Sequence, residues 1–245
     1  MTGTFINIAT VLVGTILGLL LGGRLKEGTK QTVMAGLGLV TIVNGIHMTL
    51  DTSNILIMLG SVLVGGILGE WWRIEDGLNW IGKWLADRFD KDEAKANTDG
   101  GGSRFIRGFV TSSLIFCVGP MTIIGSIQDG LVGDYRLLAI KSMLDGFAAL
   151  LFASSLGIGV GFSTIVILIV QGGLSLLAGQ ADAFLTDPMI AEMTAAGGVL
   201  IMAIGVGPLL ELKPIRVGNL LPALLLAPLI VWILTLLGIP LAPQF

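Results

Sequence analysis

The stretch FINIATVLVGTILGLLLG, from Phe5 to Gly22, carries no charged side chain and is long enough to cross a lipid bilayer as a helix. Similar stretches recur along the 245 residues, of which 53% are hydrophobic and 13% charged, about half the charged share of a soluble domain. Backbone groups in lipid must be hydrogen-bonded internally, which leaves helices or a closed barrel. Apolar runs such as ILIML at 55–59 do not alternate as barrel strands do. We therefore predict an all-α integral membrane protein embedded in a lipid bilayer.

About eight transmembrane helices are predicted, in a single transmembrane domain over residues 1–245. The first three lie within 5–72, a central broken helix pair lies at 105–156, and the last three lie at 162–237. The predicted helices cover 5–22, 32–50, 54–71, 105–127, 137–156, 162–178, 189–210 and 217–237.

The segment 74–89 differs from the spans because its apolar residues recur at helical spacing between charged ones. Trp80 and Trp84 lie in this segment, and tryptophan is enriched at membrane interfaces. We interpret it as an amphipathic helix in the interface plane; a solvent-exposed helix packed on the bundle is the alternative. Residues 90–104 follow as a polar linker containing Gly100-Gly101-Gly102.

The loop charges predict the orientation of the bundle. Basic residues gather on the side reached after the first, third and seventh helices: Arg24, Lys26, Lys30, Lys83, Arg88, Lys91, Lys95, Arg104, Arg107, Lys213 and Arg216. An excess of Lys and Arg marks the cytoplasmic face, so both termini are expected outside. Arg136 and Lys141 are exceptions. A re-entrant fourth helix would invert the later helices and misplace the basic loop at 213–216.

Two sequence features are typical of secondary transporters. Residues 36–45 resemble 196–205, which suggests that the first three helices recur as the last three in inverted orientation. Val-Gly-Pro occurs at 118–120 and again at 206–208. Proline lacks an amide hydrogen and displaces the carbonyl four residues earlier, which then needs another partner. That partner is a neighbouring helix, a cavity, a ligand or, in an ordinary proline kink, a local hydroxyl.

Asp145 is the foremost candidate for a binding residue. It lies about two and a half turns inside the helix at 137–156, where an ionised carboxylate must be paired, protonated or hydrated. Lys141 lies four residues earlier on the same helix face and can form an ion pair with it. We expect the pair to bind a coupling proton, a cation or the charged end of a solute. A purely structural salt bridge is the alternative.

Other polar residues are weaker candidates for a substrate or ion site. Ser126, Gln128 and Asp129 end the fourth helix and either line a pathway or cap the helix. His47 and Asn44 lie one turn apart near the end of the second helix. The remaining candidates are Gly119, in the predicted break, and Asn219, a buried amide in the last helix.

The same residues limit the classes of function. One cysteine and one histidine exclude a disulfide and a cysteine-rich metal site, and no cofactor is expected. No phosphate-binding loop, paired catalytic carboxylates or basic aromatic stretch is present, so neither an enzyme nor a nucleic-acid-binding protein is expected. A dyad of Lys141 with Ser142 or Ser113 is the only enzymatic alternative.

Secondary transport of a small molecule or ion by alternating access is the leading interpretation, with coupling to protons or another cation left open. A passive channel and a structural or regulatory membrane protein are the alternatives. Small residues at four-residue spacing, such as Gly14, Gly18 and Gly22, allow close helix packing and are compatible with a homodimer.

Several motifs together resemble one family. They are GTFIN at 3–7, GPMTIIGSIQDGL at 119–131 with Gly133-Asp134, Lys141 with Asp145-Gly146, Gly197-Gly198, and NLLPA at 219–223. The chain thus resembles the YqgA/YdfK-type bacterial inner-membrane proteins (DUF554), whose function is unknown and which are presumed to be transporters. The resemblance implies a multi-pass inner-membrane protein with eight helices and gives no substrate. Relatives often have alanine where this chain has Pro120, which would make Gly119 the cause of the break.

Overall fold

The computed structural model of the chain describes residues 1–23, 26–89 and 104–241. Every regular element in these ranges is helical. Within these ranges, seven helices are long and apolar enough to cross a membrane, and there are eight such spans if the bent pair α6–α7 forms one broken span. The prediction of an all-α membrane protein with about eight spans is confirmed. The predicted linker at 90–104 lies, except for its last residue, outside the described residues.

The helices group into two compact units. The first unit comprises residues 1–37, 77–117 and 121–181. Its helices are α1 (Thr2–Gly22), the first part of α2 (Glu27–Thr49), most of α4 (Ile74–Phe89), α6 (Arg104–Cys117), α7 (Pro120–Leu131), α8 (Arg136–Leu156), α9 (Gly159–Leu176) and the start of α10 (Ala178–Phe184). The short helix α10 falls in a predicted loop.

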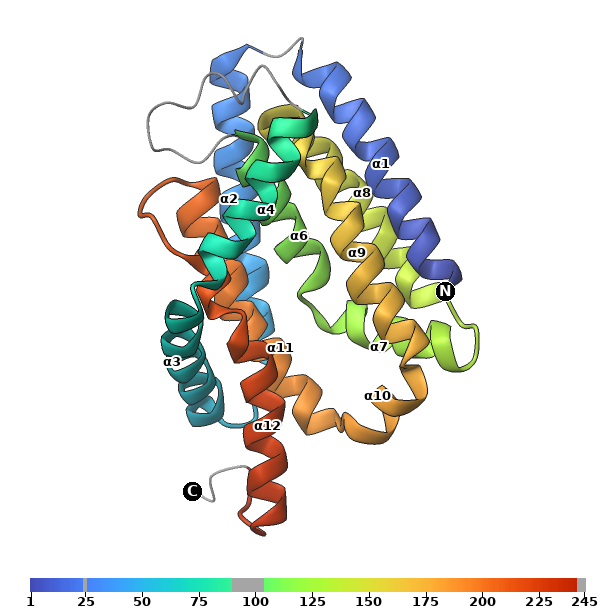
Figure 1. Cartoon of the computed structure of the whole chain (residues 1–245), viewed down its shortest axis with the longest axis vertical. Coiled ribbons are helices and arrows are strands. Elements are labelled where there is room, and N and C mark those ends of the chain that lie inside the picture. Colours follow the sequence, from blue (N-terminus) through green and yellow to red (C-terminus); the bar gives the residue numbers. More distant parts are fainter. Residues whose placement is uncertain (24–25, 90–103, 242–245) are drawn as a thin grey trace. The chain divides into compact units, whose positions relative to one another are not determined.

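Helices α1 and α8 pack side by side along their whole length, as Figure 1 shows. The predicted glycine stripe of α1 makes this possible, because a Cβ atom at these positions would overlap the backbone of α8. The contacting pairs are Gly14 with Gly146, Gly18 with Leu150 and Gly22 with Ser154. Both numbers rise together, so the two helices run parallel.

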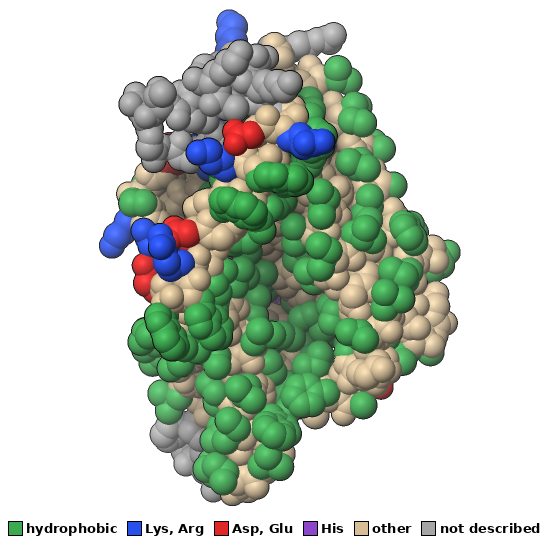
Figure 2. All heavy atoms as spheres, viewed as in Figure 1, with side chains coloured by type: hydrophobic (Ala, Val, Ile, Leu, Met, Phe, Trp, Pro, Cys, Tyr) green, Lys and Arg blue, Asp and Glu red, His purple; other side chains and the backbone are tan. Residues whose placement is uncertain are grey.

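Helix α4 packs on the first unit through one face. Leu85 is buried in a cluster with Phe105 of α6, while Trp80 and Trp84 remain exposed. This division between a packed face and exposed tryptophans is typical of a helix at a membrane interface. Hydrophobic side chains also cover the visible surfaces of α1 and α9 (Figure 2), as expected for helices that face lipid.

The second unit comprises residues 38–76, 118–120 and 182–245, of which the structure describes those up to 241. Its elements are the end of α2, α3 (Ile55–Trp72), α11 (Asp187–Ile204), the π-helical turn η1 (Gly205–Leu209), the 3-10 turn η2 (Val217–Leu220) and α12 (Pro222–Leu236). Helices α2 and α11 touch where Gly45 meets Gly198 and Gly38 meets Gly205. Helices α3 and α12 touch at Gly65 and Ala223.

The two Val-Gly-Pro sequences have different structures. At Gly119, with φ at 155°, the chain breaks between α6 and α7, which are bent by 64°. At Pro208 the helix continues through a π-helical turn, in which the Leu210 N–H donates to the Gly205 carbonyl at 2.9 Å. A π-helical turn accommodates the missing proline N–H locally. The break predicted at Pro120 is therefore present, and Pro208 produces only a local distortion.

Candidate functional site

The break between α6 and α7 leaves the Phe116 carbonyl without its usual helical partner, as Pro120 has no N–H to donate. Two side chains replace that partner. The Lys141 ammonium of α8 donates to the carbonyl at 2.7 Å, and the Thr122 hydroxyl of α7 donates at 3.2 Å. Both sequence alternatives for the freed carbonyl, a neighbouring helix and a local hydroxyl, are thus realised together.

The same lysine forms the ion pair that the sequence predicts. Lys141 Nζ contacts Asp145 Oδ2 one turn along α8, with both side chains about nine-tenths buried. The Asn7 amide of α1 also donates to Asp145 Oδ2, at 2.9 Å. A continuous network therefore joins the Phe116 carbonyl, Lys141, Asp145 and Asn7 across three helices of the first unit.

The network is electrically balanced but stores two charges in a low-dielectric interior. The stability of each charge depends on the other, since an unpaired buried ion is costly. A proton or cation arriving at Asp145 would compete with Lys141 and release the ammonium and the Phe116 carbonyl for another partner. The arrangement can thus couple occupancy of a carboxylate to the state of a helix break.

Two members of this network were not foreseen as binding residues. Asn7 is the one amide in the first apolar stretch, and its isolation among apolar residues is the signal that could have identified it. The sequence predicts that the Phe116 carbonyl needs a partner other than residue 120, but its pairing with Lys141 depends on how α6 packs on α8, which the sequence does not encode locally.

The three candidate site residues at the end of α7 differ in how exposed their side chains are. Ser126 and Asp129 are buried on one face of α7, whereas Gln128 is exposed. Asp129 Oδ2 accepts the Gly3 N–H of α1 at 2.9 Å, and the Met1 amino group lies 3.1 Å from the same oxygen. Asp129 therefore interacts with the start of another helix and does not cap its own.

In the loop that follows α7, Asp134 carries a shifted pKa. The Arg136 guanidinium and backbone N–H donate to its carboxylate, at 2.8–3.1 Å, and hold the pKa of Asp134 below its ordinary value of 3.8. This partly exposed carboxylate therefore stays ionised at neutral pH.

The other predicted site residues belong to the second unit. Gly119 marks the break, while Asn44 and His47 are exposed on α2. Asn219 is buried, accepts the Glu75 N–H at 2.7 Å and donates to Glu70 at 2.5 Å, so its contacts fix the junction of α3, α4 and η2. The predicted residues thus do not form one group, and the first unit holds the buried charged pair.

Glu192 of α11 is a buried carboxylate that sequence reasoning passed over. It accepts the Thr52 hydroxyl at 2.7 Å and the N–H groups of Ser53 and Asn54 at 2.8 and 3.0 Å. These contacts hold the turn before α3. In the described ranges, no three His, Cys, Asp or Glu side chains gather as a metal site would require.

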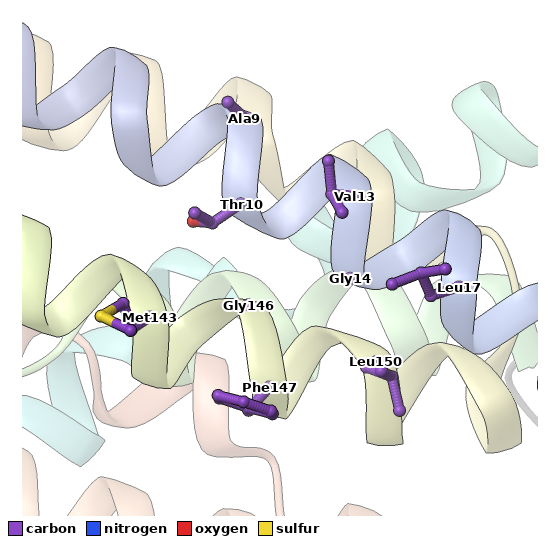
Figure 3. Close-up of a pocket in the computed structure, with 9 residues that line it drawn as sticks. All are labelled: Ala9, Thr10, Val13, Gly14, Leu17, Met143, Gly146, Phe147 and Leu150. Carbon is purple, nitrogen blue, oxygen red and sulfur yellow. The ribbon is translucent and has the colours of Figure 1, made fainter.

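A groove between α1 and α8 is an apolar surface feature of the first unit (Figure 3). Its lining residues are Ala9, Thr10, Val13, Gly14, Leu17, Met143, Gly146, Phe147 and Leu150. The Thr10 hydroxyl donates to the Asn7 carbonyl at 2.9 Å, which leaves a hydrophobic lining suited to lipid chains. A polar solute would find no fixed charge in it.

Comparison with known proteins matches residues 2–232 to the family described as "Protein of unknown function (DUF554)". The uncharacterized protein YqgA of Escherichia coli K12 is 35% identical over 225 residues, covering 92% of this chain and 94% of that protein. The uncharacterized membrane protein YdfK of Bacillus subtilis 168 is 28% identical over 243 residues, covering 98% and 99%. No solved structure matches.

Proposed function

The chain belongs to this family of unknown function, and from that premise we propose that it is a secondary transporter of a small solute in the bacterial inner membrane. One observation carries the proposal: Lys141 of the buried pair Lys141–Asp145 donates to the Phe116 carbonyl at the break of a helix. Ionisable residues inside spans commonly mark substrate or ion pathways. Broken helices supply open backbone groups to such sites in many transporters.

The directions of three packed helix pairs support eight spans with α6–α7 as a full crossing. Helices α1 and α8 run parallel, whereas α2 and α11, and likewise α3 and α12, run antiparallel. With eight spans, α1 and α8 are the first and fifth, α2 and α11 the second and seventh, and α3 and α12 the third and eighth. Because successive spans alternate in direction, the first pair should be parallel and the other two antiparallel. A re-entrant α6–α7 would reverse all three. An excess of Lys and Arg is typical of cytoplasmic loops, and this supports a topology with both termini outside.

Contacts within each unit also support an inverted repeat. The predicted counterparts are α1 and α9, α2 and α11, and α3 and α12, and each pair packs together. The aligned glycines are Gly38 with Gly198 and Gly45 with Gly205. If each glycine is replaced by its counterpart in the other repeat, the contact of Gly45 with Gly198 becomes a contact of Gly205 with Gly38. Both contacts are present. Alternating access in such proteins exchanges the conformations of the two repeats.

In the proposed mechanism, Lys141 alternates between partners. With Asp145 ionised, the ammonium binds the carboxylate and the Phe116 carbonyl and holds α6 against α8. A proton or cation on Asp145 weakens this attraction, so that the ammonium turns to an anionic or carbonyl group of the solute. Return of Lys141 to Asp145 then releases the solute and the proton or cation. The solute class expected from this chemistry has at least one anionic or strongly hydrogen-bond-accepting group.

Uptake by purified protein in liposomes tests the proposal. A library of small anionic and zwitterionic solutes is screened with a proton gradient, a sodium gradient or neither. We expect gradient-driven uptake that Asp145→Asn abolishes and Asp134→Asn leaves intact, because Asp134 is a partly exposed carboxylate outside the network. Uptake unaffected by Asp145→Asn would remove the pair from the mechanism. Absence of uptake by folded protein would favour the structural or regulatory alternative.

A further inference from the structure

We propose a binding site for a sodium-sized cation at the start of α1, formed by five buried oxygen atoms that lack hydrogen-bond partners among the described residues. This inference rests on the proposed function only in naming the coupling ion. The oxygens are Thr4 Oγ1, Asn7 Oδ1, Ser126 Oγ, Asp129 Oδ1 and Gln171 Oε1. All five side chains belong to the first unit and are at most 3% exposed.

Contacts between α1 and α7 bring the first members together. Asp129 Oδ2 is bound to the Gly3 N–H and lies beside the Met1 amino group, which leaves Oδ1 open. Thr4 follows Gly3 directly, and Asn7 lies one turn further along the same face of α1. The carboxylate is therefore anchored next to a face that presents two more open oxygens.

Helix α9 completes the group. Ser126 lies three residues before the carboxylate on α7, and its carbonyl accepts the Ser175 hydroxyl at 3.0 Å. Gln171 lies four residues before Ser175 on the same face of α9, and the adjoining Gly172 approaches the start of α1. Figure 1 shows the start of α1, α7 and the end of α9 gathered near the amino terminus.

The chemistry of the open atoms favours a cation. Asn7 must present Oδ1 to the group, because its Nδ2 donates to Asp145 and a carboxylate cannot donate in return. Carboxylate, amide and hydroxyl oxygens are the ligands of hard cations. Asp129 also lies in the last turn of α7, where the helix dipole is negative. Asn7 belongs to this group and also donates to Asp145, so a cation here would be sensed at the Lys141–Asp145 pair.

Sodium binding is measured on the full-length protein in detergent, with no solute present. Radioactive sodium should bind at about one ion per chain, and NaCl should raise the Tm by roughly 5 °C over choline chloride at equal ionic strength and about 100 times Kd. Asp129→Asn and Ser126→Ala should each weaken binding at least about tenfold, the loss of one good ligand.

Two matched variants control for unspecific effects. Ser163→Ala removes an equally buried hydroxyl of α9 that already donates to the Val160 carbonyl at 2.7 Å. Glu192→Gln removes the charge of a buried carboxylate in the other unit. Both should retain the wild-type affinity for sodium, even where the Tm without sodium falls.

The proposed cation site and the proposed transport function are contradicted by different results. Sodium binding lost on Asp129→Asn, with no transport of any solute, would uphold the site and contradict the proposed function. Proton-driven uptake by a protein that binds no radioactive sodium, and whose Tm does not change with NaCl, would overturn the site. The proposed transport function would remain. Equal binding in the Asp129→Asn and wild-type proteins would also overturn it.

Discussion

At the scale of single residues, the energy of the Lys141–Asp145 pair depends on keeping both partners. Removing one partner of a buried pair leaves an uncompensated charge and typically costs about 3–5 kcal/mol, whereas replacing both with apolar residues is often neutral. We therefore expect Lys141→Met and Asp145→Leu each to lower the Tm strongly. The double variant should recover most of that loss. Thermal unfolding of the four proteins in one detergent measures the coupling, and additive losses would contradict a direct interaction.

The sequence predicts this pair because both residues lie on one helix, where spacing alone places them together. It does not predict Asn7 as the third member, since that contact joins residues 138 positions apart on α1 and α8. Asp129 shows the same limit. Its position at a helix end suggested capping of α7, but its partner is the Gly3 N–H of another helix. Contacts within a helix follow from spacing, and contacts between helices depend on packing.

At the scale of elements, the break between α6 and α7 depends on Gly119 more than on Pro120. The backbone φ of 155° at Gly119 is one that residues with a Cβ rarely adopt, whereas Pro120 occupies the first position of α7, where any helix former is accepted. We expect Pro120→Ala to retain the wild-type Tm and Gly119→Ala to lower stability by about 1–3 kcal/mol through backbone strain.

Cys117 reports on the same break. It is the chain's only cysteine and is partly exposed beside Gly119. The rate of maleimide labelling of this thiol should be unchanged in Pro120→Ala and altered in Gly119→Ala. The reverse order of effects would assign the break to the proline ring and not to the glycine.

The helix boundaries were more predictable than the form of the two distortions. Apolar length fixed the spans to within a few residues, as at 137–156 against α8 (Arg136–Leu156). The two identical Val-Gly-Pro triplets, however, gave a 64° break in one case and a π-helical turn in the other. Gly119 has a positive φ, and Gly207 is not among the glycines with one. Neighbouring helices decide between the two forms, and the triplet does not.

At the scale of the whole molecule, the direction of every helix after α7 depends on whether α6–α7 crosses the membrane. The loop after α7 and the loop after η1 lie on opposite sides in both topologies, but the sides are exchanged between them. Val132 and Leu212, 77% and 72% exposed, mark these two loops. A pair of single-cysteine variants therefore distinguishes the topologies with opposite signals.

In a Cys117→Ser background, Val132→Cys should react with a membrane-impermeant maleimide on right-side-out vesicles, because eight spans place this loop outside. Leu212→Cys should react only after permeabilisation, since it precedes Lys213 in a basic loop that the charge distribution predicts to be cytoplasmic. Labelling of both after permeabilisation controls for reactivity. With the amino terminus outside, the exchanged pattern would make α6–α7 re-entrant, conflict with the parallel packing of α1 on α8, and remove the opposite orientation that an inverted repeat requires.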